Sequence, residues 1–114
     1  MNKSSCVAAV LIFSSSFFIN NVLADTISDC YFQAKFLERT VIAYQGHYMG
    51  TGQIYQEAIT AFRGNPSENE KSWAKRIISL VYNNPENQFV NSTAVADEYM
   101  GNCLMYPEKY LIKR

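Results

Sequence analysis

Apolar residues gather first at the N-terminal end of the chain, in a stretch that three serines interrupt. Lys3 gives this stretch a basic start, and Val22 and Ala24 occupy the small-residue positions that signal peptidase recognises before its cut. The stretch is too short and too polar to cross a bilayer as a helix. We therefore predict that residues 1–24 are an export signal peptide and that residues 25–114 form one domain.

Beyond the predicted cut, apolar residues recur at spacings of three and four, which is typical of amphipathic helices. No segment alternates apolar and polar residues for six positions, as a half-buried strand would. Four helices are predicted: residues 26–46, 51–64, 68–82, and a last helix from a cap at Asn91 or Ser92 up to Pro107. The fold class is therefore all-α, a small four-helix bundle-like domain.

One stripe of each predicted helix carries the residues expected in the core. These are Cys30, Ala34, Leu37, Val41 and Tyr44; Ile54, Ala58, Ala61 and Phe62; Trp73, Ile77, Leu80 and Val81; and Val95, Ala96, Tyr99, Met100 and Cys103. Phe89, in a connecting loop, is expected to pack onto the core as well. Residues 109–114 form a basic tail, and whether residues 110–112 dock on the body stays open. Residues 91–93 match a glycosylation acceptor, but a helix cap is the favoured interpretation.

The cysteines predict one disulfide. Cys6 lies in the predicted signal peptide, ahead of its apolar stretch, where it does not suit lipidation. Cys30 and Cys103 remain, and an even pair in an exported chain most simply forms a bridge. This bridge would join the first and last helices, packed antiparallel, and would contribute roughly 4 kcal/mol in the chain-entropy model. Two cysteines and one histidine are too few ligands for a metal, so neither a metal nor a cofactor is expected.

Charge argues against nucleic acid as a partner. The whole chain carries ten basic and ten acidic residues, and removal of Lys3 with the signal leaves a slight acidic excess. Phosphate binding needs a basic surplus on one face. The cluster of Lys109, Lys113 and Arg114 is terminal, which favours a solvated tail over contact with anionic lipid. No stable membrane insertion is expected once the signal is removed.

No catalytic residue is predicted. His47 is the only histidine, and no serine or spare cysteine stands in a nucleophile pattern. Glu68 and Glu70 point to different faces of their helix. The glycines lack the order that cradles phosphate. The sequence therefore favours a protein that is not an enzyme.

Aromatic residues are concentrated in one glycine-rich hinge, residues 44–52. One interpretation is that Tyr44 and Tyr48 cap the small core. The other is a binding loop, because tyrosine combines a large apolar face with a hydroxyl and is enriched where proteins bind proteins. The candidate partner-binding residues are Tyr44, His47, Tyr48, Met49 and Tyr82.

The order Cys30, Gln45-Gly46, Tyr82-Asn83-Asn84-Pro85 and Cys103 resembles a group of small secreted helical proteins from proteobacteria and their phages. In that group a cysteine opens the first helix and a Gln-Gly turn follows an arginine, whose position Tyr44 occupies here. A Tyr-x-x-Pro ends the third helix, and a final cysteine closes the pattern. The resemblance implies a helical fold, a disulfide and export in a Gram-negative cell, but it implies no activity.

Two functions are compatible with these features. The first is a binding module of the periplasm, or of the extracellular space, that contacts another protein as an inhibitor or immunity protein does. The alternative is an acid- or stress-responsive periplasmic chaperone, with carboxylates as its trigger. The identity of the partner and the oligomeric state stay open.

Overall fold

The computed structural model describes the backbone of residues 3–62 and 65–113, and the side chains within those ranges from residue 23 onward. Its elements are α1 (Lys3–Gly46), α2 (Thr51–Ala61), α3 (Glu68–Tyr82), the 3-10 turn η1 (Pro85–Gln88), α4 (Ser92–Met105) and α5 (Pro107–Tyr110). All regular structure in the described residues is helical, which confirms the all-α prediction. The predicted signal peptide lies, apart from its last two residues, outside the described side chains, so it stays a prediction.

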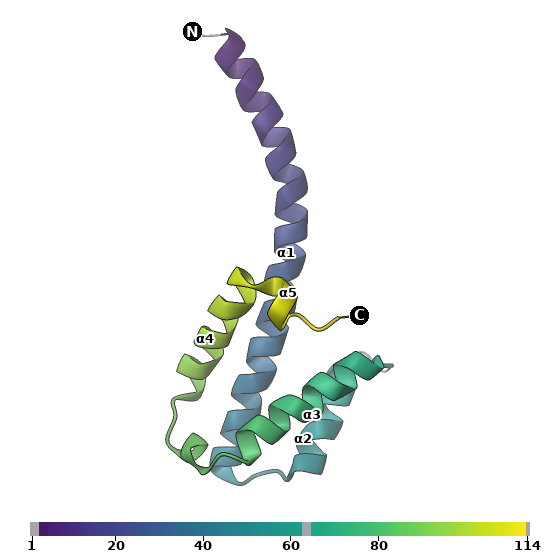
Figure 1. The fold of residues 1–114 in the computed structure, drawn as a ribbon, viewed down its shortest axis with the longest axis vertical. Helices are drawn as coiled ribbons and strands as arrows, with labels where there is room; N and C mark the ends of the chain where they lie inside the picture. The colour runs from purple at the N-terminus through teal and green to yellow at the C-terminus, as the bar shows by residue number, and fades with distance from the viewer. Residues whose placement is uncertain (1–2, 63–64, 114) are drawn as a thin grey trace.

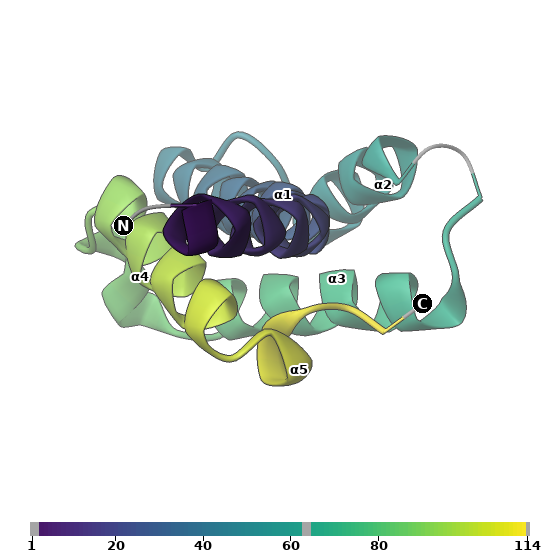
Figure 2. The same cartoon turned by 90° about the horizontal axis from the view of Figure 1, so that it is seen from above.

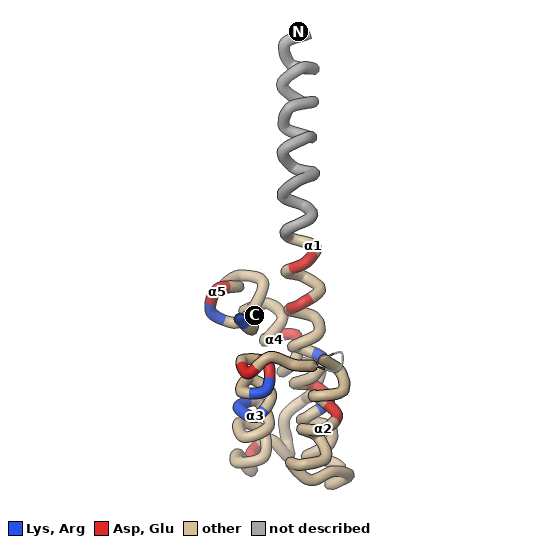
Figure 3. The backbone as a smooth tube through the Cα atoms, turned by 90° about the vertical axis from the view of Figure 1, so that its right-hand side faces the viewer, with Lys and Arg blue, Asp and Glu red and all other residues tan. Residues whose placement is uncertain are grey.

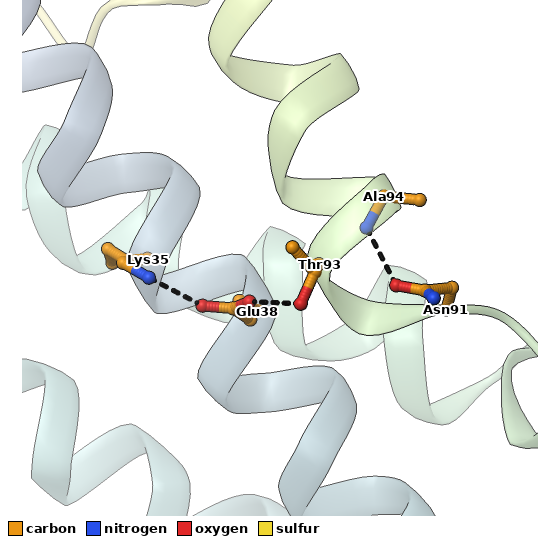
Figure 4. Close-up of polar contacts among 5 residues, drawn as sticks. All are labelled: Lys35, Glu38, Asn91, Thr93 and Ala94. Atoms are coloured by element: carbon orange, nitrogen blue, oxygen red, sulfur yellow. Dashed lines mark hydrogen bonds and ion pairs between the residues drawn. The ribbon is translucent and has the colours of Figure 1, made fainter.

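The helix boundaries follow local signals in the sequence. Ser67 and Glu70 form a capping box at the start of α3: the Glu70 amide donates to Ser67 Oγ over 3.1 Å, and the Ser67 amide donates to Glu70 Oε1 over 2.8 Å. At the start of α4, Asn91 Oδ1 accepts from the Ala94 amide over 2.9 Å (Figure 4). The cap predicted for the last helix is therefore Asn91.

One predicted boundary is wrong. Thr26 was expected to begin the first helix, but α1 continues through it. The sequence holds neither glycine nor proline before Gly46, so nothing local stops the helix ahead of Thr26. A cap signature within an uninterrupted helix-forming stretch does not by itself start a helix.

Helix α4 runs antiparallel beside α1, while α2 and α3 form a helical hairpin on the other side of α1 (Figure 1). Seen from above, α3 lies on one side of the layer that α1 and α2 make (Figure 2). Cys30 of α1 and Cys103 of α4 are bonded, with Cα atoms 5.7 Å apart and no exposed surface, which confirms the predicted disulfide. A disulfide of this kind indicates an oxidising compartment.

A polar contact also joins α1 to α4 (Figure 4). Glu38 of α1 pairs with Lys35 Nζ at 2.9 Å and accepts a hydrogen bond from the Thr93 hydroxyl, on α4, at 3.0 Å. Both pairings favour the ionised carboxylate, so they lower the pKa of Glu38, with the Lys35 contact as the larger cause.

The core lies where α1, α2 and α3 meet. Its buried cluster consists of Phe36, Ala43, Ile54, Ala58, Trp73, Ala74, Ile77 and Ile78. Three expected core residues are exposed to solvent: Ala61, Leu80 at 55% and Phe89 at 90%. Leu80 lies about a quarter turn from the centre of the stripe that α3 buries, at about 100° per residue. It therefore lies just outside the buried stripe, and its side chain is left partly in solvent.

The C-terminal residues dock on the body through Gln33, whose side chain is almost fully buried. Its amide nitrogen donates to the Tyr110 carbonyl at 2.8 Å and to Tyr99 Oη at 2.6 Å, and its amide oxygen accepts from the Ile112 amide at 3.1 Å. The question left open for residues 110–112 is thus answered: they pack on the domain. Lys109 and Lys113 stay exposed on either side of the docked residues.

Candidate functional site

The predicted hinge includes the end of α1, and the first residue after that helix, His47, has a left-handed backbone conformation. The His47 amide donates to the Tyr44 carbonyl and the Tyr48 amide to the Ala43 carbonyl, both at 3.3 Å, which is the Schellman pattern. His47 has a φ of 55°, at a position where glycine is usual. The helix ends at Gly46, as predicted, and His47 makes the turn that follows.

Tyr82, from the end of α3, holds the loop that follows. Its hydroxyl donates to the Met49 carbonyl at 2.9 Å, and its ring meets the Tyr44 ring edge-on with centroids 5.1 Å apart. Burial raises the pKa of Tyr82, so the phenol stays a donor at neutral pH. Three of the five candidate residues are thus brought together, all of them half-buried.

The other two candidates face solvent. His47 is exposed, and Tyr48 is 65% exposed with its ring lying against Gly46. Core capping, the first interpretation of this hinge, therefore describes Tyr44 but not Tyr48. The structure leaves the Tyr48 ring available for contact with another molecule.

A second loop packs against the same end of α1. The Gln45 side-chain amide donates to the carbonyls of Asn87 and Val90 at 2.8 and 2.7 Å, and the Gln88 side chain donates to the Tyr44 carbonyl at 3.3 Å. Asn87 donates in turn to the Val81 carbonyl at 2.9 Å. Phe89 lies between the two residues that Gln45 binds, and its ring is left outside. This explains why the expected packing of Phe89 on the core does not occur.

We call this part of the molecule the loop end, and define it as residues 40–56 and 77–96. Glu86 is the only Asp, Glu, Lys or Arg within these ranges. Figure 3 shows the other charged residues along the rest of the body, at a distance from the α1–α2 loop. The loop end also carries three large apolar side chains that are mostly exposed: Tyr48, Leu80 and Phe89.

Sequence reasoning found Tyr48 but missed Phe89 and Leu80 as surface residues. An apolar residue between polar neighbours in a loop, as in Gln88-Phe89-Val90, gives no local sign of whether it points inward or outward. One sequence signal could have indicated a surface position for Phe89: few charged residues lie near it in the chain. Charged residues are depleted at the centre of protein interfaces.

The loop end holds little that could act as a catalyst or bind a metal. Among the described residues, no three His, Cys, Asp or Glu side chains lie together as a metal site would need. Cys30 and Cys103 are joined to each other, away from this end. What the loop end offers is a phenol, an imidazole and apolar surface, on a backbone fixed by hydrogen bonds.

Comparisons with known protein families, with curated proteins and with solved structures found no match. The resemblance to the small secreted helical proteins of proteobacteria and their phages therefore stays a prediction. Its short motifs have a structural role here. Gln45 and Tyr82 donate hydrogen bonds to the two connections of the loop end, and Pro85 begins η1. Within the part of the chain that the structure describes, no helix is long and apolar enough to cross a membrane.

Proposed function

We propose that this protein is a binding module that contacts another protein through its loop end. The observation that carries the proposal is the exposure of Tyr48 and Phe89, 65% and 90%, in two stretches of chain whose only Asp, Glu, Lys or Arg is Glu86. Residues that dominate binding energy are most often large rings at the centre of an interface, surrounded by few charges.

The rigidity of the loop end supports the same conclusion. Gln45 fixes the backbone on both sides of Phe89, and Tyr82 fixes the loop next to Tyr48. A surface that is already ordered loses less conformational entropy when it binds. Tyr48 and Phe89 are therefore suited to act as preformed anchors.

The compartment narrows the kind of partner. The disulfide indicates an oxidising environment, and the predicted signal peptide indicates export. We therefore propose that the protein works in the periplasm, with the extracellular space as the alternative. An inhibitor or immunity protein that blocks an exported enzyme or toxin fits a small, rigid, near-neutral domain of this kind.

Site-specific cross-linking tests the proposal. A photoreactive phenylalanine analogue is placed at position 48 or 89 of the full-length chain, and at Met105 as a control. Met105 is 69% exposed and is the last residue of α4, whereas the loop end holds the first residues of that helix. We expect one discrete covalent adduct from each loop-end position and none from position 105. Adducts with many unrelated proteins would instead favour the chaperone alternative.

The captured partner then allows affinity to be measured by calorimetry. We expect Tyr48→Ala and Phe89→Ser each to weaken binding by about tenfold or more, because truncation of a central anchor costs more than about 1.4 kcal/mol. The control Met105→Ser should change affinity by less than about twofold. Equal effects of all three substitutions would contradict a site at the loop end.

A further inference from the structure

A groove opens at the border of the loop end, between the start of α2 and the second half of α3. It has a volume of about 370 Å³, and its floor is formed by the buried Ile78 with the rings of Tyr55 and Tyr82 beside it. Thr51, Ser79 and Asn83 give it a polar rim. This volume is near the lower limit of small-molecule sites, about 300 Å³, so it suits one large side chain.

Lys75 is the only charged residue that lines the groove. Its ammonium lies 5.4 Å from the centre of the Tyr55 ring, and no ion pair is found for it among the described residues. By contrast, the neighbouring Lys71 pairs with Glu68 at 2.9 Å. Lys75 therefore presents a positive charge, positioned by an aromatic ring, at the edge of an apolar floor.

Gly52 keeps one wall of the groove open. It lies within α2, yet a Cβ atom added there would meet nothing within 4 Å. Neither a close contact nor an unusual backbone angle thus calls for glycine at this position. A larger residue can therefore be placed at position 52 without a clash, and because Gly52 lines the groove, this is the position at which we test whether the groove can be blocked.

We propose that the groove receives an apolar side chain of the partner protein, next to a carboxylate that pairs with Lys75. The ligand is therefore a peptide segment in which a large apolar residue adjoins an acidic one. The argument rests on complementarity: an apolar floor takes the apolar side chain, and the lysine at its edge takes the carboxylate. This inference rests on the proposed function, because it describes how the partner of the loop end is recognised.

Two matched peptides test this chemistry on the protein expressed from its full-length gene. The first is acetyl-Gly-Trp-Asp-Gly-amide, and the second has asparagine in place of aspartate. In a titration followed by amide NMR, we expect shifts confined to residues that line the groove, such as Gly52, Tyr55 and Ser79. The aspartate peptide should bind about fivefold more tightly, as a partly solvated charge pair contributes about 1 kcal/mol.

Variants separate the two parts of the site. Lys75→Gln should remove the preference for the aspartate peptide while the weaker binding persists. Gly52→Phe should abolish the binding of both peptides, whereas Gly52→Ala should retain it. Gly101→Phe is the matched control, because position 101 is equally open but lies on α4. It should leave both titrations unchanged.

Three results would overturn the inference: no localised shifts, equal affinity for both peptides, or binding that survives Gly52→Phe in a folded variant. Binding of dodecanoate at the groove without binding of either peptide would also overturn it, in favour of a lipid carboxylate. The proposed function fails separately, through loss of the adducts at positions 48 and 89. If the adducts form but the groove binds neither peptide, the proposed function stands and only the present inference is overturned.

Discussion

At the scale of single residues, the loop end contains one backbone conformation that its residue type does not favour. His47 adopts a φ of 55° in the turn after α1, although the chain has Gly46 beside it. A left-handed conformation costs a residue with a Cβ atom roughly 1 kcal/mol relative to glycine. Such strain gathers at functional surfaces, and here it lies directly before the exposed Tyr48.

Replacing this histidine with glycine should therefore stabilise the protein. We expect His47→Gly to raise the free energy of unfolding by about 1 kcal/mol, because the strain is relieved and no buried contact of His47 is lost. His47→Val should lower it, since a β-branched residue tolerates positive φ poorly. Urea unfolding monitored by circular dichroism measures both changes. A glycine variant no more stable than the wild type would show that the turn is unstrained.

Gln33 is the second residue whose role depends on its surroundings. Gln33→Leu would keep the volume of the side chain but leave the Ile112 amide without its acceptor. The Tyr110 carbonyl would lose its shorter hydrogen bond and keep only the Tyr99 hydroxyl, at 3.3 Å. We expect a loss of about 2–3 kcal/mol, typical of buried polar groups left without hydrogen bonds. Hydrogen exchange at Ile112 should accelerate beyond this global change. Slow exchange at Ile112 in the variant would mean that other contacts hold the C-terminal residues.

At the scale of elements, the fold depends on the pairing of α1 with α4. The disulfide joins them at Cys30 and near the end of α4, and the contact of Glu38 with Thr93 joins them further along. On its other side, α1 is joined to α2 by an ion pair, in which Arg39 Nε donates to Glu57 Oε1 at 2.8 Å. Helix α1 is thus the element through which the other helices are connected.

Removing the disulfide should weaken the domain without changing its helical class. We expect the double variant Cys30→Ser, Cys103→Ser to lose about 2–5 kcal/mol, because the bridge closes a loop over 73 residues of separation. Thermal unfolding with and without reductant measures the effect. Reductant should lower the midpoint of the wild type and leave that of the variant unchanged. A wild-type midpoint insensitive to a reductant that does reduce the bridge would contradict this account.

At the scale of the whole molecule, the ion pairs found among the described residues all lie outside the loop end. Hydrogen bonds from Lys35, Arg39 and Lys71 lower the pKa values of Glu38, Glu57 and Glu68, respectively. A carboxyl group with a lowered pKa in the folded state stabilises the fold above its ordinary pKa. That stabilisation is lost as the pH falls through the lowered value. The acid sensitivity of the protein should come from these pairs.

We therefore expect stability to be constant between about pH 8 and pH 5 and to decrease below about pH 4. The decrease should be modest, because the pairs are at the surface and the disulfide does not titrate in acid. Urea midpoints across this range measure it, and Glu57→Gln should flatten part of the decrease. Strong binding of a hydrophobic dye near pH 3 would contradict the prediction and favour the acid-responsive chaperone.

Much of the fold was predictable because its signals are local. Asn91 was one of the two caps expected for the last helix, and the asparagines and proline after Tyr82 marked the end of α3. The disulfide followed from an even cysteine count and helical periodicity. For the loop end, glycines and tyrosines identified the hinge, but they did not distinguish the half-buried Tyr44 from the exposed Tyr48.

The sequence by itself determined the helical class, most helix ends and the cysteine pairing, because capping, periodicity and composition act over a few residues. Only the tertiary structure decided that Phe89 and Leu80 face solvent, that Gln33 is buried, and that a groove forms beside Lys75. The physical reason is that burial depends on which element lies opposite a side chain. That neighbour is set by the packing of distant helices, about which a local pattern carries no information.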